Sequence, residues 1–140
     1  MDQWDGYMAA RARLTRFLSQ GEVRNPIIVS GDTHASWVNE VKADFDDPNS
    51  PVVAAELGGP SITSKSGPEF VARVQKALTD NPHIRFFEGT RHGYVRCHAA
   101  PDVLRADYRV VRSVWEPSEV PSTLAAVEIE DGSPEPALVS

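Results

Sequence analysis

The chain has 140 residues, a length that suits one domain. Its 41% hydrophobic and 24% charged residues are close to the globular average, which excludes disorder throughout the chain. The net charge of −6, with arginines scattered along the chain, excludes the basic surface of a nucleic-acid-binding protein. No apolar run approaches the roughly 20 residues of a membrane-spanning helix, so no membrane partner is expected. The acidic start lacks the basic and then apolar pattern of an export signal, so none is expected in this chain.

Cysteine, glycine and proline usage limits the architecture further. Cys97 is the single cysteine, which excludes an intramolecular disulfide and a cysteine-rich zinc site. It stands in the alternating stretch 94–98, which favours a buried structural thiol over a reactive one. Nine glycines and eleven prolines predict many turns between short elements rather than a helix bundle.

The amino-terminal part is expected to form a helix followed by a strand. Residues 7–20 carry apolar side chains three or four positions apart, and Gly21 follows as a typical residue after a helix end. The apolar stripe consists of Tyr7, Ala10, Leu14, Phe17 and Leu18. Residues 25–30 then predict a strand, whose apolar and β-branched run suits an interior position covered on both faces.

The middle of the chain carries both strand and helix signals. Residues 35–43 fit either a strand or a short helix, and residues 44–51 predict an acidic loop that contains proline. Residues 51–57 predict a second buried strand. A capping-box pattern, Ser66 followed by Glu69, and an early proline predict a helix that runs to about residue 80.

The carboxyl-terminal half is expected to be rich in β-strands. Four segments combine β-branched and aromatic residues with partial alternation, namely 84–88, 93–98, 108–115 and 123–130. Residues 132–140 are expected to form a flexible, frayed tail. The order of elements predicts an α/β chain without a visible division into two domains.

The best local candidate for chemistry is Gly31-Asp32-Thr33-His34, at the end of the first predicted strand. Side chains at the carboxyl edge of a sheet border a cleft in many α/β folds. Asp32 and His34 are two residues apart, so an extended backbone directs both side chains to one side. A carboxylate oxygen with an imidazole nitrogen suits Fe, Mn, Zn or a mixed pair of ions. The alternative is an Asx turn at Asp32 with a loop histidine beside it.

Other polar residues offer weaker candidates for metal ligands. These are His83, His92, His98, Asp44, Asp46, Asp47 and Glu56. His83 fits a solvated cap after a helix, and the acidic loop 44–47 fits a solvated turn, since it lacks the EF-hand spacing. His92 and His98 share one face of a predicted strand about 20 Å apart, so a regular strand keeps them from binding one ion. The chain contains no nucleophile-elbow, P-loop or dinucleotide-binding motif.

Taken together, the motifs resemble the carboxyl-terminal part of the PhoD-like alkaline phosphatases, a branch of the metallophosphoesterases. The resemblance covers about residues 2–115, most of the chain, and is far more specific than G-D-x-H alone. The matching segments are 2–7, 11–14, 25–37, 42–48, 51–53, Glu56, 61–64, 81–85, 92–95 and 107–111.

The resemblance implies a fold, an activity and a set of roles. It implies part of a two-layer β-sheet sandwich flanked by helices, a phosphate ester substrate, and a family that is extracellular or periplasmic. Related metallophosphoesterases end with a G-H-x-H metal motif, where PhoD-like proteins show G-D-x-H. Asp32 and His34 are therefore implied as the catalytic metal ligands, at a site that uses Fe³⁺ with Ca²⁺. Trp4, Tyr7 and Trp37 are implied to frame the site or to pack in the core.

The resemblance also predicts that the site is incomplete. The family's earlier motifs, which supply the first aspartate and the asparagine and histidine ligands, are absent from this chain. Residues 1–131 are thus expected to be the carboxyl-terminal part of a PhoD-like domain that is inactive alone, missing an amino-terminal portion or a complementing chain. The strand that ends at Ser30 is expected to lack a neighbour, which favours poor solubility or oligomerisation. The alternative is a non-catalytic, truncated paralogue that acts as a binding module.

Overall fold

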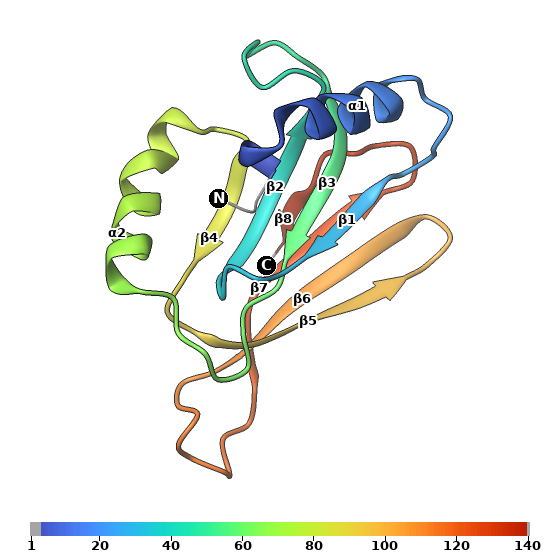
Figure 1. Ribbon diagram of the computed structural model, residues 1–140. Coiled ribbons are helices and arrows are strands. Elements are labelled where there is room, and N and C mark those ends of the chain that lie inside the picture. Colours follow the sequence, from blue (N-terminus) through green and yellow to red (C-terminus); the bar gives the residue numbers. More distant parts are fainter. Residues whose placement is uncertain (1–3, 140) are drawn as a thin grey trace.

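Two four-stranded β-sheets face each other in the computed structural model, which describes residues 4–139 (Figure 1). The elements in chain order are η1 (Trp4–Gly6), α1 (Met8–Ser19), β1 (Ile27–Ser30), β2 (Ser36–Lys42), β3 (Val52–Gly58), α2 (Pro68–Ala77), η2 (Leu78–Asp80), β4 (Ile84–Glu88), β5 (His92–Ala99), β6 (Val103–Val111), β7 (Ser122–Glu130) and β8 (Ala137–Val139). The expected two-layer sandwich with a β-rich carboxyl-terminal half is confirmed. No helix within the described range is both long enough and apolar enough to cross a membrane.

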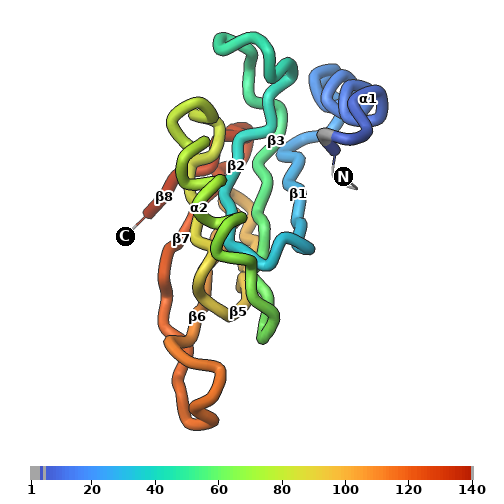
Figure 2. Tube along the Cα trace, turned by 60° about the vertical axis from the view of Figure 1, so that its left-hand side comes forward, coloured from blue at the N-terminus to red at the C-terminus, as the bar shows by residue number. Residues whose placement is uncertain are grey.

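The two sheets differ in their strand pairing. The first sheet has the order β1-β3-β2-β4, in which β1 runs parallel to β3 and the other pairs are antiparallel. The second sheet is an antiparallel meander with the order β5-β6-β7-β8. Figure 2 shows α1 on the side of the first sheet that faces away from the second sheet. The core therefore lies between the two sheets, and α1 covers part of the outer face.

The central core joins apolar side chains from both sheets. Its buried members are Val38, Ala55, Leu57, Ala106, Tyr108, Val127 and Ile129. Tyr108 is the largest fully buried side chain; its ring lies 5.7 Å from that of Phe86, centroid to centroid. Its hydroxyl donates a hydrogen bond to the backbone carbonyl of Trp37 in the opposite sheet, and burial raises the pKa of the phenol. Tyr108 thus ties the two layers together.

The first helix forms as predicted but buries little of its apolar stripe. Gly21 follows it with φ +73°, as expected of a residue after a helix end. Tyr7 is 58% exposed and Phe17 is also exposed, whereas Leu18 packs on a second cluster around Ala54. The second sheet lies on the opposite face of the first sheet from α1. Among the described residues, little surface is therefore available to cover the apolar stripe of α1.

Several strand predictions are confirmed and one needs correction. Residues 35–43, which fitted strand or helix, contain strand β2, and β3 is a buried central strand as expected. Strand β1 also forms, but the expectation of an interior strand covered on both faces is wrong. Within the described residues it pairs with β3 alone, so it is an edge strand. Val29 is consequently 70% exposed.

The second helix forms without the predicted capping box. Helix α2 and the short η2 together span most of the expected range, with Pro68 in the first turn. The residue before the helix is Gly67, and no side-chain hydrogen bond caps the amino end of the helix. Ser66 donates elsewhere, to the turn that follows β1. The motif therefore placed the helix correctly and misassigned the serine.

The carboxyl-terminal region departs from expectation at three places. Strand β6 ends at Val111, four residues before the predicted end at Trp115, which lies in the following loop. The expected frayed tail includes strand β8, which pairs with β7. Cys97, expected to be buried, is exposed because β5 is an edge strand. The alternation of apolar and polar residues along a strand does not show whether that strand lies at the edge of its sheet.

The contact between Tyr108 and Trp37 predicts a measurable loss of stability. The substitution Tyr108→Phe keeps the buried ring and removes the hydroxyl donor, so we expect the free energy of unfolding to fall by about 1–2 kcal/mol. Urea denaturation followed by tryptophan fluorescence measures this change. The matched control, Tyr94→Phe on the exposed side of β5, should change stability by less than about 0.5 kcal/mol. Equal losses in both variants would contradict the role of Tyr108.

Candidate functional site

The turn after β1 holds Asp32 and His34 in an unusual backbone conformation. The N–H of Thr33 donates to the carbonyl of Gly31 at 2.9 Å, and the central residue Asp32 has φ +73°. This arrangement is the rare and strained form of the γ-turn. His34 also has a positive φ, +58°. Positive φ is uncommon outside glycine, and Asp and His are among the residues that tolerate it best.

This geometry changes two expectations about the turn. Asp32 and His34 do not lie on an extended backbone, so strand alternation does not determine where their side chains point. The hydrogen bond that closes the turn comes from a backbone carbonyl rather than from the Asp32 carboxylate, so the expected Asx turn is not what shapes it. Asp32 is exposed and His34 is half-buried. Two residues with metal-binding side chains thus occupy strained positions in one short turn.

Two side chains hold this turn in place, Ser66 from a distant part of the chain and Trp37 from the adjacent strand β2. The Ser66 hydroxyl lies 2.9 Å from the carbonyl oxygen of Thr33 and 3.0 Å from that of His34, so its proton is donated to this pair of carbonyls. The indole N–H of Trp37 donates to the Thr33 hydroxyl at 2.8 Å. Strained backbone persists only where its surroundings over-determine it. These contacts supply that constraint on both sides of the turn.

Trp37 is itself fixed by close packing. Its ring centroid lies 4.5 Å from that of Phe87 and 6.5 Å from that of Phe70 in α2. Gly58 faces it across the β2–β3 pair, and a Cβ there would lie 3.0 Å from the Trp37 side chain. Any larger residue would displace the indole. The implied framing role of Trp37 is therefore supported by direct contact with the turn.

The other two aromatic residues implied by the resemblance are not core residues. Trp4 is 42% exposed, and Tyr7 is also exposed, at the start of α1. The alternative that they pack in the core is wrong for the described residues, and their role in framing a site stays a prediction. Asp2 and Gln3, which begin the matching segment, lie outside the described residues.

Glu56 braces the end of β1 rather than offering an open ligand. Its Oε1 accepts a hydrogen bond from the Ser30 hydroxyl at 2.7 Å, and its Oε2 accepts one from Asn39 Nδ2 at 2.9 Å. The three residues come from β1, β3 and β2, and they link the strands immediately before the turn. Both carboxylate oxygens are thus engaged within the sheet.

The remaining candidates lie apart from the turn or serve local structure. The His83 ring packs against Phe45, with 5.1 Å between centroids. His92 and His98 are at opposite ends of β5, as expected, and the buried Nδ1 of His92 lacks a hydrogen-bond partner. The acidic loop forms two turns closed by its own carboxylates, Asp44 and Asp47, which confirms the interpretation as a turn. Among residues 4–139, no group of three His, Cys, Asp or Glu side chains is placed to hold a metal ion.

Arginine side chains on the second sheet are engaged with carboxylates of the same sheet. Arg96 lies 2.6 Å from Asp107 Oδ2, and Arg105 bridges Asp107 and Glu128. The hydrogen bond from Arg96, followed by that from Arg105, holds the pKa of the Asp107 carboxyl below its usual range. Arg96 and Arg105 therefore stabilise the outer face of the sheet.

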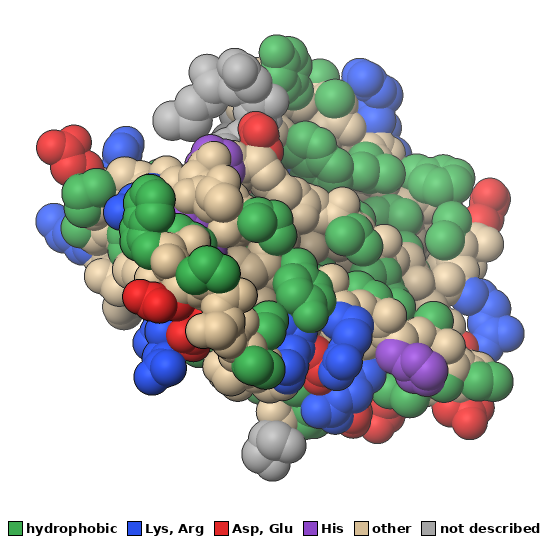
Figure 3. Space-filling view, turned by 90° about the horizontal axis from the view of Figure 1, so that it is seen from below, with side chains coloured by type: hydrophobic (Ala, Val, Ile, Leu, Met, Phe, Trp, Pro, Cys, Tyr) green, Lys and Arg blue, Asp and Glu red, His purple; other side chains and the backbone are tan. Residues whose placement is uncertain are grey.

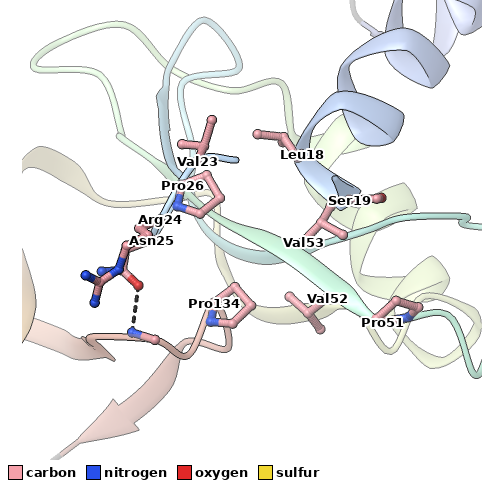
Figure 4. A pocket seen from close by; sticks show the side chains of 11 residues that line it. Leu18, Ser19, Val23, Arg24, Asn25, Pro26, Pro51, Val52, Val53 and Pro134 are labelled. Atoms are coloured by element: carbon pink, nitrogen blue, oxygen red, sulfur yellow. Dashed lines mark hydrogen bonds between the residues drawn. The ribbon is translucent and has the colours of Figure 1, made fainter. Parts of the chain in front are cut away.

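One pocket in the described structure lies away from the turn. It measures about 350 Å³ and sits at the amino end of β1, whereas Asp32 and His34 follow the carboxyl end. Figure 4 shows Leu18, Pro26, Val52 and Pro134 around it, and a hydrogen bond from the Gly132 N–H to Asn25 at its rim. The Arg24 guanidinium beside it is paired with Asp131 at 2.9 Å. This pocket carries none of the sequence-predicted site residues.

The sequence predicts Asp32 and His34 as candidates and, through the resemblance, Trp37 as a framing residue, but it does not predict that Ser66 holds the turn. Ser66 was assigned to a helix cap, and its contact with the turn is visible only in three dimensions. Trp37 and Thr33 are four residues apart. Because residues 35–43 fitted either a strand or a helix, the sequence did not predict how the indole and the hydroxyl are placed relative to each other.

Comparison with known proteins places these features in a family. A family model described as PhoD-like phosphatase matches residues 1–108. Alkaline phosphatase D of Bacillus subtilis (strain 168) is 42% identical over 127 residues, which are 90% of this chain and 22% of that protein. A solved structure titled Structure of PhoD matches with a TM-score of 0.85 and 36% identity, over 99% of this chain and 27% of that chain. The chain thus spans about a quarter of the length of these relatives. On this evidence from sequence and structure, the chain belongs to the PhoD-like phosphatase family.

Proposed function

We propose that the chain forms the last metal-ligand segment of a PhoD-like phosphoric ester hydrolase, in which Asp32 and His34 bind the metal. The observation that carries the proposal is the strained turn that presents both residues and is held by Ser66 and Trp37. Backbone strain that the surroundings maintain is concentrated at functional sites. The family assignment supplies the reaction class, hydrolysis of a phosphate ester.

Asp32 and His34 provide the types of donor atom that suit the proposed Fe³⁺ and Ca²⁺, but they provide too few of them. A carboxylate oxygen suits a hard ion such as Ca²⁺ or Fe³⁺, and an imidazole nitrogen suits iron. The Asp32 side chain is exposed, so it is accessible to an ion. Two ligands do not complete a coordination sphere, and the described residues bring no third one to them. The remaining ligands are proposed to come from outside this chain.

Asp32, His34 and the residues that brace the turn have proposed tasks in the complete site. Bound metal ions supply an activated water and stabilise charge that develops on the phosphoryl oxygens. Asp32 and His34 would hold the ions, and the Ser66 hydroxyl would keep the carbonyls beside them in place. Glu56 would fix the end of β1 against β2 and β3, which limits movement of the turn.

The proposal extends to the protein's setting. We infer a phosphate ester as substrate and an extracellular or periplasmic location, both on the strength of the family. The chain by itself is proposed to be inactive or nearly so, because its ligand set is incomplete. The alternative of a non-catalytic binding module differs in one respect: it predicts no response of the fold to metal ions.

The first test is hydrolysis of para-nitrophenyl phosphate by the isolated chain with Fe³⁺ and Ca²⁺ present. We expect no release of para-nitrophenol above the uncatalysed rate, since two ligands cannot hold a catalytic metal centre. The Asp32→Ala variant should be indistinguishable from the parent chain. Turnover by the isolated chain that disappears in Asp32→Ala would contradict the proposed inactivity.

Calorimetry with and without metal separates the proposed site from a binding module. A ligand that binds the folded state raises the melting midpoint, so Fe³⁺ or Ca²⁺ should raise it in the parent chain. Asp32→Ala and His34→Ala should each abolish that rise. Asp46→Asn, an exposed carboxylate in the acidic loop, is the matched control and should retain it. A midpoint that does not respond to either metal would favour the non-catalytic alternative.

A third test addresses Ser66 as a positioning residue. Ser66→Ala removes the hydroxyl that donates to the Thr33 and His34 carbonyls, so the metal-induced rise in the midpoint should shrink. Ser66→Thr restores a hydroxyl and should restore the rise, and Ser64→Ala, at an exposed position nearby, should leave it unchanged. An unchanged rise in Ser66→Ala would show that the turn does not depend on this contact.

A further inference from the structure

The turn between β7 and β8 contains a pair of residues that is chemically labile in proteins. Asp131 is followed by Gly132, and the N–H of Ser133 donates to the carbonyl of Glu130 at 3.1 Å, which closes a four-residue turn around the pair. Gly132 has φ +83°, as the third residue of a type II turn requires. Glycine has no side chain to shield its backbone nitrogen, and a Cβ at Gly132 would meet no atom within 4 Å. The nitrogen that follows Asp131 is therefore sterically open.

The reaction available to this pair is isomerisation through a cyclic imide. The backbone nitrogen of Gly132 attacks Cγ of the Asp131 carboxylic acid, so that an N–Cγ bond forms and a C–O bond of the carboxyl breaks. The amide proton and the hydroxyl leave together as water. A water molecule then adds to the main-chain carbonyl carbon of Asp131 and breaks its bond to the nitrogen, which regains a proton. The chain now continues through Cγ, and the product is isoaspartate with its free carboxylate on Cα.

Two residues before β1 hold both groups that would react. Asn25 Oδ1 accepts a hydrogen bond from the Gly132 N–H at 2.7 Å, and Asn25 Nδ2 donates to Asp131 Oδ1. Arg24 Nη2 lies 3.1 Å from Asp131 Oδ1 and 2.9 Å from Oδ2. Figure 1 shows the chain before β1 beside the loop between β7 and β8. These contacts of Arg24 and Asn25 with Asp131 and Gly132 are named the clasp.

The clasp opposes each step of imide formation. The carboxylate is bonded to two side chains, so Cγ cannot turn toward the Gly132 nitrogen while these bonds persist. The N–H that has to lose its proton is engaged by Asn25. Hydrogen bonds to a charged group are among the stronger ones in proteins. Isomerisation at Asp131 therefore requires the clasp to open first.

The clasp also links the two sheets in a loosely filled region. The segment before β1 leads into the first sheet, whereas the turn that contains Asp131 belongs to the second. Asn25 lines two cavities, of about 350 Å³ and about 180 Å³. Isoaspartate carries an additional carbon in the main chain and its carboxylate on a different carbon, so Arg24 and Asn25 would lose their partner. Conversion of Asp131 would thus free the start of β1 from the second sheet.

We propose that Asp131-Gly132 is an isoaspartate-forming site that the clasp keeps unreactive, and that its conversion releases the chain before β1. The four residues of β1, about 13 Å of strand, separate the clasp from the turn with Asp32 and His34. Figure 3 views the molecule from below, the end at which β1 finishes, whereas the clasp lies at the other end of β1. The proposal is therefore independent of the proposed metal chemistry.

The first test is incubation of the full chain at neutral pH, below its melting midpoint, followed by peptide mapping. Electron-transfer fragmentation in the mass spectrometer distinguishes isoaspartate from aspartate. We expect slow formation of isoaspartate at Asp131 in the parent chain. Asn25→Ala should raise the rate about tenfold, the factor that loss of a hydrogen bond to a charged group allows. Arg24→Gln should raise it by a smaller factor, because an exposed ion pair is weak.

Three controls separate the clasp from general unfolding. Asn49→Ala, at an exposed position in the acidic loop, is the matched change of residue and should leave the rate at Asp131 unchanged. Tyr108→Phe weakens the core without touching the clasp, and it should also leave this rate unchanged. The second Asp-Gly pair in the chain, Asp5-Gly6, should isomerise at one rate in every variant. Since Arg24 is exposed, Arg24→Gln should fold even if Asn25→Ala does not.

The second test asks whether conversion of Asp131 frees the start of β1. The N–H of Ala55 donates to the Pro26 carbonyl beside the clasp, at 3.3 Å, and the N–H of Gly59 donates to the Ser30 carbonyl at the far end of β1, at 2.9 Å. Amide hydrogen exchange measured by NMR reports the opening of each bond. In the isomerised chain, exchange at Ala55 should become several-fold faster, while exchange at Gly59 should stay as in the parent.

The opposite results overturn the proposal. Equal rates of isomerisation in the parent, Asn25→Ala and Arg24→Gln would show that the clasp does not protect Asp131. A rise of the same size in Tyr108→Phe would assign the reaction to general unfolding. An absence of isoaspartate at Asp131 even in urea would remove the site altogether. Exchange at Ala55 that does not change after isomerisation would show that the start of β1 is not released.

Discussion

The buried contact between Tyr108 and Trp37 is the constraint on which the rest of the structure depends. Tyr108 fills the centre of the core from the second sheet, and its hydroxyl donates to the backbone of β2 in the first sheet. The residue that accepts this bond also donates through its indole to the turn after β1. A single path therefore connects the packing of the two layers to the backbone of the candidate site.

The turn after β1 illustrates how contacts from the rest of the fold maintain a strained backbone. The positive φ values of Asp32 and His34, which flank Thr33, cost of order 1–3 kcal/mol each relative to relaxed backbone. The contacts from Ser66 and Trp37 are what keep this conformation from relaxing. An exposed loop without such contacts would adopt a lower-energy path, so the geometry of the turn depends on the assembled sandwich.

The surface of the sandwich carries several uncovered features that are unrelated in sequence. An apolar strand at an edge, an exposed thiol on an inner face and an uncovered helix stripe all border regions where the described residues provide no partner. Among the described residues, Asp32 and His34 likewise have no third side chain beside them with which to hold a metal ion.

The sequence by itself determined most of the elements, the family and the two candidate ligands. Periodicity and turn residues are local signals, so they placed α1, β3 and α2, and the ordered motifs around Gly31-Asp32-Thr33-His34 identified the PhoD-like resemblance. Only the tertiary structure decided that β1 lies at an edge and that Cys97 is exposed, because an apolar run shows that a strand can be buried but not whether a neighbour is present. It alone also decided the role of Ser66, whose hydroxyl reaches a turn more than thirty residues earlier. Contacts of that range arise from how elements pack, and no local pattern encodes them.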